Sequence, residues 1–251
     1  MLIGLKRPIA FCLVTIGFCS FAAHASIPWP VEVVCPVGGE KFEYYETAAY
    51  TIFGSRPDGK PYGTWVFPNP LAECPTNKLI IFDKFTDEEI DKLKVIIASP
   101  EYLQLAVAHT PYYRAYWLAK ALNRTREEQR SLMMQATWEA DKKDTLRKEY
   151  LREFLAFSEA LPDGDVAFEN SWLQLRYANA ERELGLFENA KTRINMLLDR
   201  RIIDNTNANG EFPQEVKFLR HYAKKLMSVI KRRDSEIEPK SLVPKKWKKW
   251  D

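Results

Sequence analysis

The spacing of apolar residues changes at about residue 85, and this change divides the chain into two parts. From 85 to 233 apolar residues recur every three or four positions, which places their side chains on one face of a helix. Two such faces consist of Leu146, Tyr150, Phe154, Phe157 and Leu161, and of Val216, Leu219, Ala223, Leu226 and Ile230. From 26 to 84 the apolar runs are short and are separated by prolines and turn residues, as is typical of strands and loops.

These two patterns predict an α+β fold that is mostly α. We expect a small β-rich segment over residues 26–84 to pack on an irregular array of antiparallel helix pairs over residues 85–233. Residues 234–251 then form a polar, basic tail, because acidic residues and two prolines follow the last apolar helical face. We expect this tail to contribute little to folding.

Local signals indicate where several elements begin or turn. Thr86 with Glu89, and Thr125 with Glu128, match the capping box that starts a helix. Residues 57–61 contain Asp-Gly between two prolines, a strong turn signal because glycine readily adopts the positive φ that a hairpin turn requires. The chain therefore predicts a hairpin around residue 58 and helices that start after the two threonines.

The spacing of apolar residues predicts the clearest helix pair within residues 166–200, with one helix over 166–184 and the other over 187–200. The first helix is apolar on two sides and should therefore pack on two sides. One side carries Phe168, Trp172 and Leu175, and the other carries Leu173, Tyr177, Ala180 and Leu184. The pair resembles a tetratricopeptide repeat, in which a glycine permits a sharp turn between helices and small alanines allow close approach. The positions that carry this resemblance are Trp172, Tyr177, Ala178, Gly185, Phe187, Ala190 and Ile194.

The N-terminus has the features of a secretory signal peptide. Two basic residues precede an apolar run over 9–22, and Ala23 and Ala25 are the small residues that a signal peptidase reads. The alternative is a membrane anchor, but a spanning helix needs about 20 apolar residues. We therefore expect residues 1–25 to be removed before Ser26, which predicts a periplasmic or secreted protein.

Charge is unevenly distributed along the chain. Residues 224–251 hold ten Lys and Arg against four Asp and Glu, whereas the whole chain carries a formal net charge of +3. The end of the chain combines lysines with tryptophans, a composition that suits weak contact with an anionic membrane surface, although a solvated tail is the simpler alternative. The residues in question are Lys245, Lys246, Trp247, Lys248, Lys249 and Trp250. An exported protein is not expected to have a nucleic-acid partner.

Two short motifs around Cys35 and Cys74 resemble the knuckles of a zinc ribbon. Each begins with Cys-Pro, but Gly38 and Asn77 stand where the second cysteine of a Cys-x-x-Cys knuckle would be. Together with the helices, these motifs are similar over residues 31–200 to uncharacterised bacterial proteins that pair a cysteine-knuckle segment with tetratricopeptide-like helices. The resemblance implies an architecture and no established activity.

The resemblance also implies that Cys35 and Cys74 are close together, because the two knuckles of a zinc ribbon face each other across one metal ion. With two ligands missing and an oxidising compartment expected, we predict a disulfide between them. A zinc-binding module is the alternative, although a structural zinc site needs four ligands.

Signals for catalysis are weak. His109 and His221 are far apart in the sequence, and no metal-binding helix, nucleophile elbow or glycine-rich phosphate loop is present. We therefore expect no cofactor and no metal, and an enzyme is the less favoured class. The densest aromatic cluster consists of Tyr112, Tyr113, Tyr116 and Trp117. This cluster predicts either core packing between the two parts of the chain or an aromatic binding surface.

The favoured hypothesis is an exported protein- or peptide-binding scaffold whose partner belongs to the cell envelope. One alternative is a cell-envelope enzyme with a site at the junction of the β-rich segment and the helices, near Tyr112–Trp117. The other is the zinc-binding module.

Overall fold

The computed structural model describes residues 28–47, 49–159, 165–203 and 214–242, and these residues form an α+β fold that is mostly helical, as predicted. The strands are β1 (Pro28–Val34), β2 (Lys41–Thr47), β3 (Ile52–Ser55), β4 (Pro61–Gly63), β5 (Ala72–Glu73), β6 (Ile80–Ile81), β7 (Val166–Ala167) and β8 (Ile202–Ile203). The helices are α1 (Asp87–Ile96), α2 (Pro100–Ala108), α3 (Pro111–Ala121), α4 (Arg126–Glu139), α5 (Asp144–Leu155), α6 (Phe168–Glu183), α7 (Phe187–Asp199) and α8 (Gln214–Lys231).

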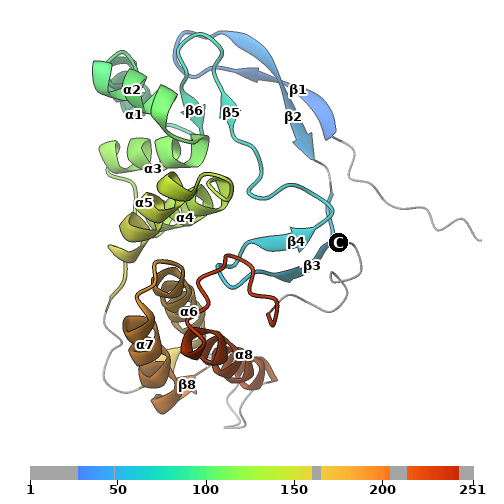
Figure 1. Cartoon of the computed structure of the whole chain (residues 1–251). Coiled ribbons are helices and arrows are strands. Elements are labelled where there is room, and N and C mark those ends of the chain that lie inside the picture. Colours follow the sequence, from blue (N-terminus) through green and yellow to red (C-terminus); the bar gives the residue numbers. More distant parts are fainter. Residues whose placement is uncertain (1–27, 48, 160–164, 204–213, 243–251) are drawn as a thin grey trace, which may run out of the picture.

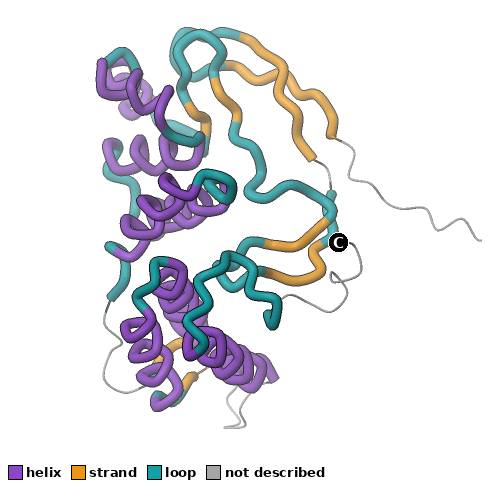
Figure 2. Tube along the Cα trace, viewed as in Figure 1, coloured by secondary structure: helices purple, strands orange, loops and turns teal. Residues whose placement is uncertain are grey.

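The helices form a column along one side of the molecule, and the strands before α1 lie along the other side (Figures 1 and 2). Strands pair only two at a time among the described residues: β1 with β2, β3 with β4 and β5 with β6 are antiparallel, and β7 with β8 is parallel. Hairpin β3–β4 lies beside α6 and α8, two helices that are distant from it in the sequence. None of the described helices combines the length and the apolar character needed to cross a membrane.

Several local predictions are confirmed. Thr86 and Glu89 form a complete capping box at the start of α1, and Thr125 and Glu128 form one at the start of α4. The predicted apolar face of α8 is buried along its whole length. Most of the predicted face at α5 is buried as well, while Leu161 lies outside the described residues. The hydrophobic pattern was therefore sufficient to orient these helices.

Helix α6 joins two hydrophobic cores. The first core contains side chains from α1 to α5 and the cysteine segment, and the second contains side chains from α7 and α8. Leu173, Tyr177, Ala180 and Leu184 pack in the first core, whereas Phe168, Trp172 and Leu175 pack in the second. The predicted two-sided packing of this helix is thus confirmed.

The residues expected to pack the α6–α7 pair do so. Ala178, Ala190 and Ile194 are buried in the second core, with Phe187 against it, and Gly185 ends α6 with φ of +76°. A positive φ is accessible to glycine at little cost, which explains its position between the helices. Assignment of this pair to the tetratricopeptide repeat family stays a prediction.

Replacing Ala190 by glutamate should lower the free energy of unfolding by at least about 2 kcal/mol, because a carboxylate would be buried at a helix contact without a partner. Ala190 is fully buried, whereas Asn195 on the same helix is exposed. Asn195→Glu, which adds the same charge to α7, should therefore change stability by less than about 0.5 kcal/mol. Urea unfolding measures both, and equal effects would mean that this face of α7 is not packed.

The predicted boundary of the C-terminal tail needs correction. The segment after α8 packs on the helices: Arg182 Nη1 donates to the carbonyl of Asp234 at 2.7 Å, Pro239 is buried, and Leu242 packs against the second core. The acidic residues and prolines after α8 are compatible with the end of the helix, but the segment that contains them still packs on the protein. Residues 243–251, with the six lysines and tryptophans proposed for membrane contact, lie outside the described residues, as do the signal peptide and its cleavage site.

Candidate functional site

The turn between β3 and β4 directs charged side chains toward the helices. The N–H of Arg56 donates to the carbonyl of Lys60 at 2.8 Å, and the N–H of Gly59 donates to the carbonyl of Arg56 at 2.9 Å. The carboxylate of Asp58 accepts from the N–H of Lys60 at 3.1 Å. Arg56 and Asp58 are buried. The Asp-Gly turn predicted from the sequence is therefore present, and it also places an ion pair inside the protein.

Asp58 lies at the centre of a group of buried ions. Each of its carboxylate oxygens accepts from Arg56, through Nε at 3.1 Å and through Nη2, and Oδ2 also accepts from Nη2 of Arg147 at 3.0 Å. Asp141 completes the arrangement by accepting from Nη1 of Arg56 at 2.7 Å, Nη1 of Arg147 at 2.9 Å and Nζ of Lys60 at 2.6 Å. These bonds attach the hairpin to the start of α5.

The same network continues into α6 and the segment after α8. Arg147 pairs with Glu183 at 2.7 Å, and Glu183 accepts from Nδ2 of Asn179 at 2.8 Å. The oxygen of Asn179 in turn accepts from Nε of Arg182 at 3.0 Å, whose Nη1 reaches the carbonyl of Asp234. We refer to Arg56, Asp58, Lys60, Asp141, Arg147, Arg182 and Glu183 as the ion cluster. It holds together four parts of the chain that are distant in sequence.

Cations determine the ionisation of the central carboxyls of the ion cluster. Burial alone would raise the pKa of Asp58, but the charge and hydrogen bonds of Arg56 and the charge of Arg147 lower it below its ordinary value. The pKa of Asp141 is also lowered, because Arg56 and Lys60 outweigh its partial burial. Both groups are therefore ionised at neutral pH and occupied by cations, which makes them unsuited to proton transfer.

A cavity of about 600 Å³ lies between hairpin β3–β4, α6, α8 and the segment after α8. Its apolar wall is formed by Trp172 and Leu175 from α6, Phe218 and Tyr222 from α8, and Leu242. The ring centroids of Trp172 and Tyr222 are 5.6 Å apart, and those of Trp172 and Phe218 are 6.1 Å apart. This volume is within the usual range for small-ligand pockets.

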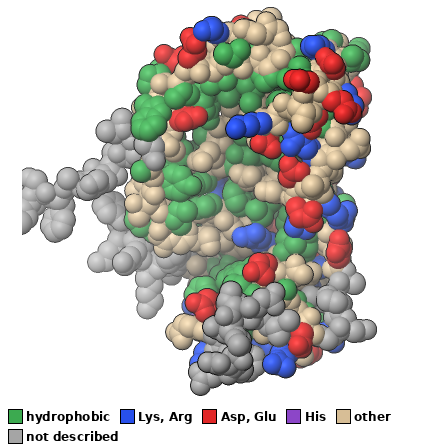
Figure 3. Space-filling view, turned by 180° about the vertical axis from the view of Figure 1, so that it is seen from behind, with side chains coloured by type: hydrophobic (Ala, Val, Ile, Leu, Met, Phe, Trp, Pro, Cys, Tyr) green, Lys and Arg blue, Asp and Glu red, His purple; other side chains and the backbone are tan. Residues whose placement is uncertain are grey.

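The polar lining of the cavity is basic. Arg56 and Arg176 lie in its wall, and Lys225 and His221 are exposed residues of α8 that also border it. Among the described side chains that line the cavity there is no carboxylate. On the face seen in Figure 3, acidic and basic side chains are interspersed. The described lining of the cavity, by contrast, contains basic side chains and no acidic ones.

Gly59 positions the guanidinium of Arg176. A Cβ atom at residue 59 would lie 2.7 Å from Nε of Arg176, so any other residue there would displace that side chain from its present position. Gly59 also has φ of +88°, a conformation that strains other residues. The hairpin turn therefore serves both the ion cluster and the cavity.

Gly59→Ala is expected to cost about 2 kcal/mol of stability, of which about 1 kcal/mol is backbone strain and the rest the displacement of Arg176. Gly38→Ala provides the matched control, because Gly38 has φ of +94° and a Cβ atom there would meet no other atom within 4 Å. It should show the backbone strain alone. Urea unfolding of the two variants checks this, and equal losses would mean that Arg176 moves aside freely.

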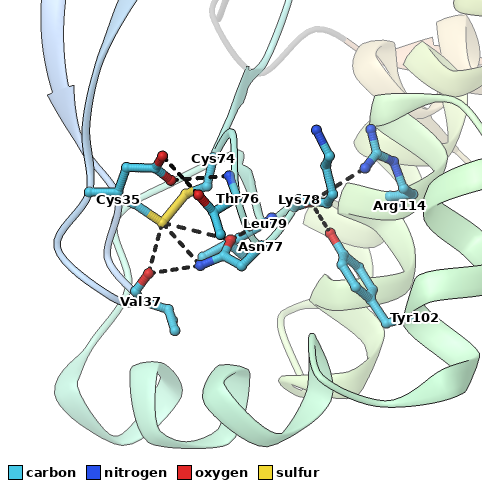
Figure 4. Close-up of a disulfide and its surroundings, with 10 residues drawn as sticks. Cys35, Val37, Cys74, Thr76, Asn77, Lys78, Leu79, Tyr102 and Arg114 are labelled. Carbon is cyan, nitrogen blue, oxygen red and sulfur yellow. Dashed lines mark hydrogen bonds between the residues drawn. A yellow bond between two sulfur atoms is a disulfide. The ribbon is translucent and has the colours of Figure 1, made fainter.

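The two cysteines form the predicted disulfide. The sulfurs of Cys35 and Cys74 are 2.11 Å apart and the Cα atoms 5.7 Å apart. Figure 4 shows the bond between the two knuckles. The N–H and hydroxyl of Thr76 also donate to the carboxylate of Glu40 at 3.1 and 2.9 Å. The disulfide and Glu40 thus join the two knuckles.

The two knuckles have the same backbone turn. In each, the N–H of the cysteine donates to the carbonyl five residues later, at 2.8 Å for Cys35 and 2.9 Å for Cys74. The residue four positions after the cysteine has a positive φ, +69° at Gly39 and +62° at Lys78. The turn inferred from the resemblance to zinc-ribbon knuckles is present in both.

The knuckles offer no set of zinc ligands. Both sulfurs are in the disulfide, and Asn77, which stands where a ligand would be, donates from Nδ2 to the carbonyl of Val37 at 2.8 Å. In the described ranges, no three His, Cys, Asp or Glu side chains are grouped to hold a metal ion. The cysteines of both knuckles are therefore bonded to each other and are not available to a metal ion.

The aromatic cluster on α3 belongs to the core, so its interpretation as a binding surface needs correction. Tyr112, Tyr113 and Tyr116 are only 5, 8 and 7% exposed, and Trp117 packs against the first core. The hydroxyl of Tyr112 donates to the carbonyl of Asn69 at 2.8 Å, which fixes the loop before β5. The core alternative is therefore the one that the structure supports.

The two histidines have different surroundings. His109 stacks on Tyr113 with ring centroids 4.2 Å apart, and its Nδ1 lies 3.1 Å from the hydroxyl of Tyr150, so it has a packing role. His221 is exposed beside the cavity.

The cavity itself was not predicted from the sequence. One available signal is on α8, where Phe218 and Tyr222 are four residues apart and lie outside the apolar face that contains Leu219 and Ala223. Trp172 and Arg176 have the same spacing on α6. Large aromatic residues outside the core-facing side of a helix indicate a second packing or binding surface.

Comparison of the chain with protein-family models, with curated proteins and with solved structures found no match. The function must therefore be argued from the cavity and its surroundings.

Proposed function

We propose that this protein is an exported binding module and that its ligand, a peptide end or a small molecule of the cell envelope, enters the cavity between hairpin β3–β4, α6 and α8. The observation that carries the proposal is the cavity itself, which has a volume of about 600 Å³ and is lined by both aromatic and basic side chains. The ion cluster supports this role because it holds hairpin and helices in one arrangement, and a pre-formed site loses less entropy on binding.

The proposal of export rests on two further observations. The first is the signal-peptide pattern of residues 1–25. The second is the disulfide between Cys35 and Cys74, since disulfides persist mainly in oxidising compartments such as the bacterial periplasm. The paired knuckle turns and the α6–α7 helix pair likewise support membership of the bacterial family with knuckle and tetratricopeptide-like segments.

Binding is favoured over catalysis by the state of the ionisable groups. Asp58 and Asp141 are held ionised by cations. Burial raises the pKa of Glu183, but its carboxylate is engaged by Arg147 and Asn179 and its side chain is only 3% exposed. A general acid or base needs a pKa near the working pH and access to substrate. These carboxylates have structural roles instead.

The proposal is tested by identifying any ligand that co-purifies with the protein. Mature protein isolated from the envelope of a bacterium that expresses it should release a defined ligand on denaturation, detectable by mass spectrometry. Ser55→Trp should abolish this, because Ser55 is an exposed residue that lines the cavity and a tryptophan there would block it. Ser131→Trp, at an exposed site on α4, is the matched control. Equal ligand content in all three proteins would contradict the proposal.

The C-terminal lysines and tryptophans are proposed to add weak contact with anionic lipid. Each lysine near such a surface contributes about 1 kcal/mol at best, so flotation with anionic vesicles should be seen at low salt and lost near physiological salt. Replacing Trp247 and Trp250 by alanine should weaken it further. Flotation that is unchanged after removal of residues 243–251 would contradict this role, and so would its absence at low salt.

A further inference from the structure

Arg176 is a half-buried cation without an ionic partner. By contrast, Arg56, which lines the same cavity, and Arg147 in the ion cluster are each paired with carboxylates. Among the described residues, no side chain forms an ion pair or a hydrogen bond with the guanidinium of Arg176. Its pKa is lowered, because burial removes water and the charge of Asp58 compensates only in part. Because this side chain is only half-buried and lines the cavity, its guanidinium is open to an anionic ligand that enters there.

The hydroxyl of Tyr222 is a second donor in the same part of the cavity. Burial raises the pKa of Tyr222, and Arg176 is among the charges that act on this hydroxyl. The group is therefore protonated at neutral pH and can donate. It forms no hydrogen bond with the described residues, in contrast to the hydroxyls of Tyr112, Tyr113 and Tyr177 in the first core, which all do. Two donors in one cavity, both without protein acceptors, match the oxygen atoms of an anion.

The remainder of the cavity is suited to an apolar group. Trp172 and Phe218 provide aromatic surface beside Tyr222, and Leu175 and Leu242 complete the wall. Phe218 is 59% exposed although it is a large apolar side chain, so a ligand would cover surface that is now in water. Lys225 borders the entrance and adds positive charge, which favours the approach of an anion.

We propose that the cavity binds an apolar carboxylic acid, with the carboxylate on Arg176 and the hydroxyl of Tyr222 and the apolar body against Trp172 and Phe218. This inference rests on the proposed binding function and specifies its ligand class. A guanidinium and a carboxylate can form two parallel hydrogen bonds, which gives such a site both direction and strength. The carboxylate has two sources, the C-terminus of a peptide that ends in an apolar residue and a free aliphatic acid.

Calorimetric titration of the full mature protein separates these sources. The probes are N-acetyl-leucyl-phenylalanine and decanoate, each compared with its uncharged carboxamide. We expect at least one acid to bind tenfold or more tightly than its amide, because a hydrogen bond to a charged group contributes enough for a factor of roughly 10 to 100. The acid that binds more tightly identifies the source.

Variants of the two donors test the assigned contacts. Arg176→Met should remove the preference for acid over amide without lowering the melting temperature, since it deletes an unpaired charge and keeps the aliphatic stem. Tyr222→Phe should weaken acid binding about fivefold. Arg152→Met, which removes the same charge from an exposed position on α5, should bind as the wild type does.

Three results would overturn the inference. Acid and amide could bind the wild type equally, Arg176→Met could retain the preference for the acid, or neither acid could bind at millimolar concentration. The comparison of acid with amide needs only the wild-type protein, so it stands even where a variant fails to fold. The binding function is tested separately, by comparing the ligand that co-purifies with the wild type and with Ser55→Trp. That proposal therefore stands even if only the ligand class is wrong.

Discussion

Replacing Asp58 by asparagine is expected to lower the free energy of unfolding by about 3 to 5 kcal/mol. Both oxygens of Asp58 accept hydrogen bonds, and Arg56, Arg147 and the N–H of Lys60 are the donors. Asparagine has the same shape but only one accepting atom, so its NH₂ group would face a guanidinium. The buried cations would also lose one negative charge. Urea or guanidinium unfolding, followed by circular dichroism, measures the loss.

Asp91→Asn is the matched control for this prediction. Asp91 also pairs with a cation, Lys94 Nζ at 2.8 Å, but its side chain is 74% exposed. Exposed ion pairs contribute about 1 kcal/mol or less, because water already stabilises the separate charges. The control should therefore lose less than about 1 kcal/mol. Similar losses in the two variants would contradict the assignment of Asp58 as the centre of the ion cluster.

Removing the disulfide should cost about 4 kcal/mol, because it closes a long loop and restricts the unfolded chain. Cys35 and Cys74 are 39 residues apart in the sequence, and both sulfurs are buried. The comparison is between wild type and a variant with both cysteines replaced by alanine, each unfolded in urea without reductant. Adding reductant to the wild type should reproduce the loss, and it should leave the double variant unchanged.

Thiol labelling of denatured, unreduced protein gives an independent check of the same bond. The mature wild type should have no reactive thiol, whereas reduction should expose two. Stoichiometric labelling before reduction would show that the cysteines are not bonded, and the predicted stability difference would then have no basis.

Features that depend on local sequence were predictable. Capping boxes need only residues three positions apart, so Thr86 and Glu89 could be recognised directly. The two-sided packing of α6 followed from periodicity, since two apolar faces on one helix require two packing partners. The disulfide followed from the resemblance of two short motifs and the expected compartment.

Features that depend on distant contacts were not predictable. Asp58 was recognised as a turn residue, yet its partner Arg147 is 89 positions further along the chain, and no pattern in one sequence links the two. The proposed role of Arg176 could not be predicted for the same reason. It depends on the absence of an ionic partner among the described residues, and a sequence does not show which side chains surround a residue. The tyrosines of α3 were ambiguous for another reason: tyrosine suits a core and a binding surface equally well, and only its burial decides.

The most direct measurement of the central claim is a crystal structure of the mature protein with N-acetyl-leucyl-phenylalanine or decanoate, whichever binds more tightly. The carboxylate should lie within hydrogen-bonding distance of Arg176 and the hydroxyl of Tyr222, with the apolar part against Trp172. The ion cluster at hairpin β3–β4 should be unchanged. A ligand bound elsewhere, or an Arg176 that pairs with a carboxylate of the protein itself, would contradict the proposed carboxylate site.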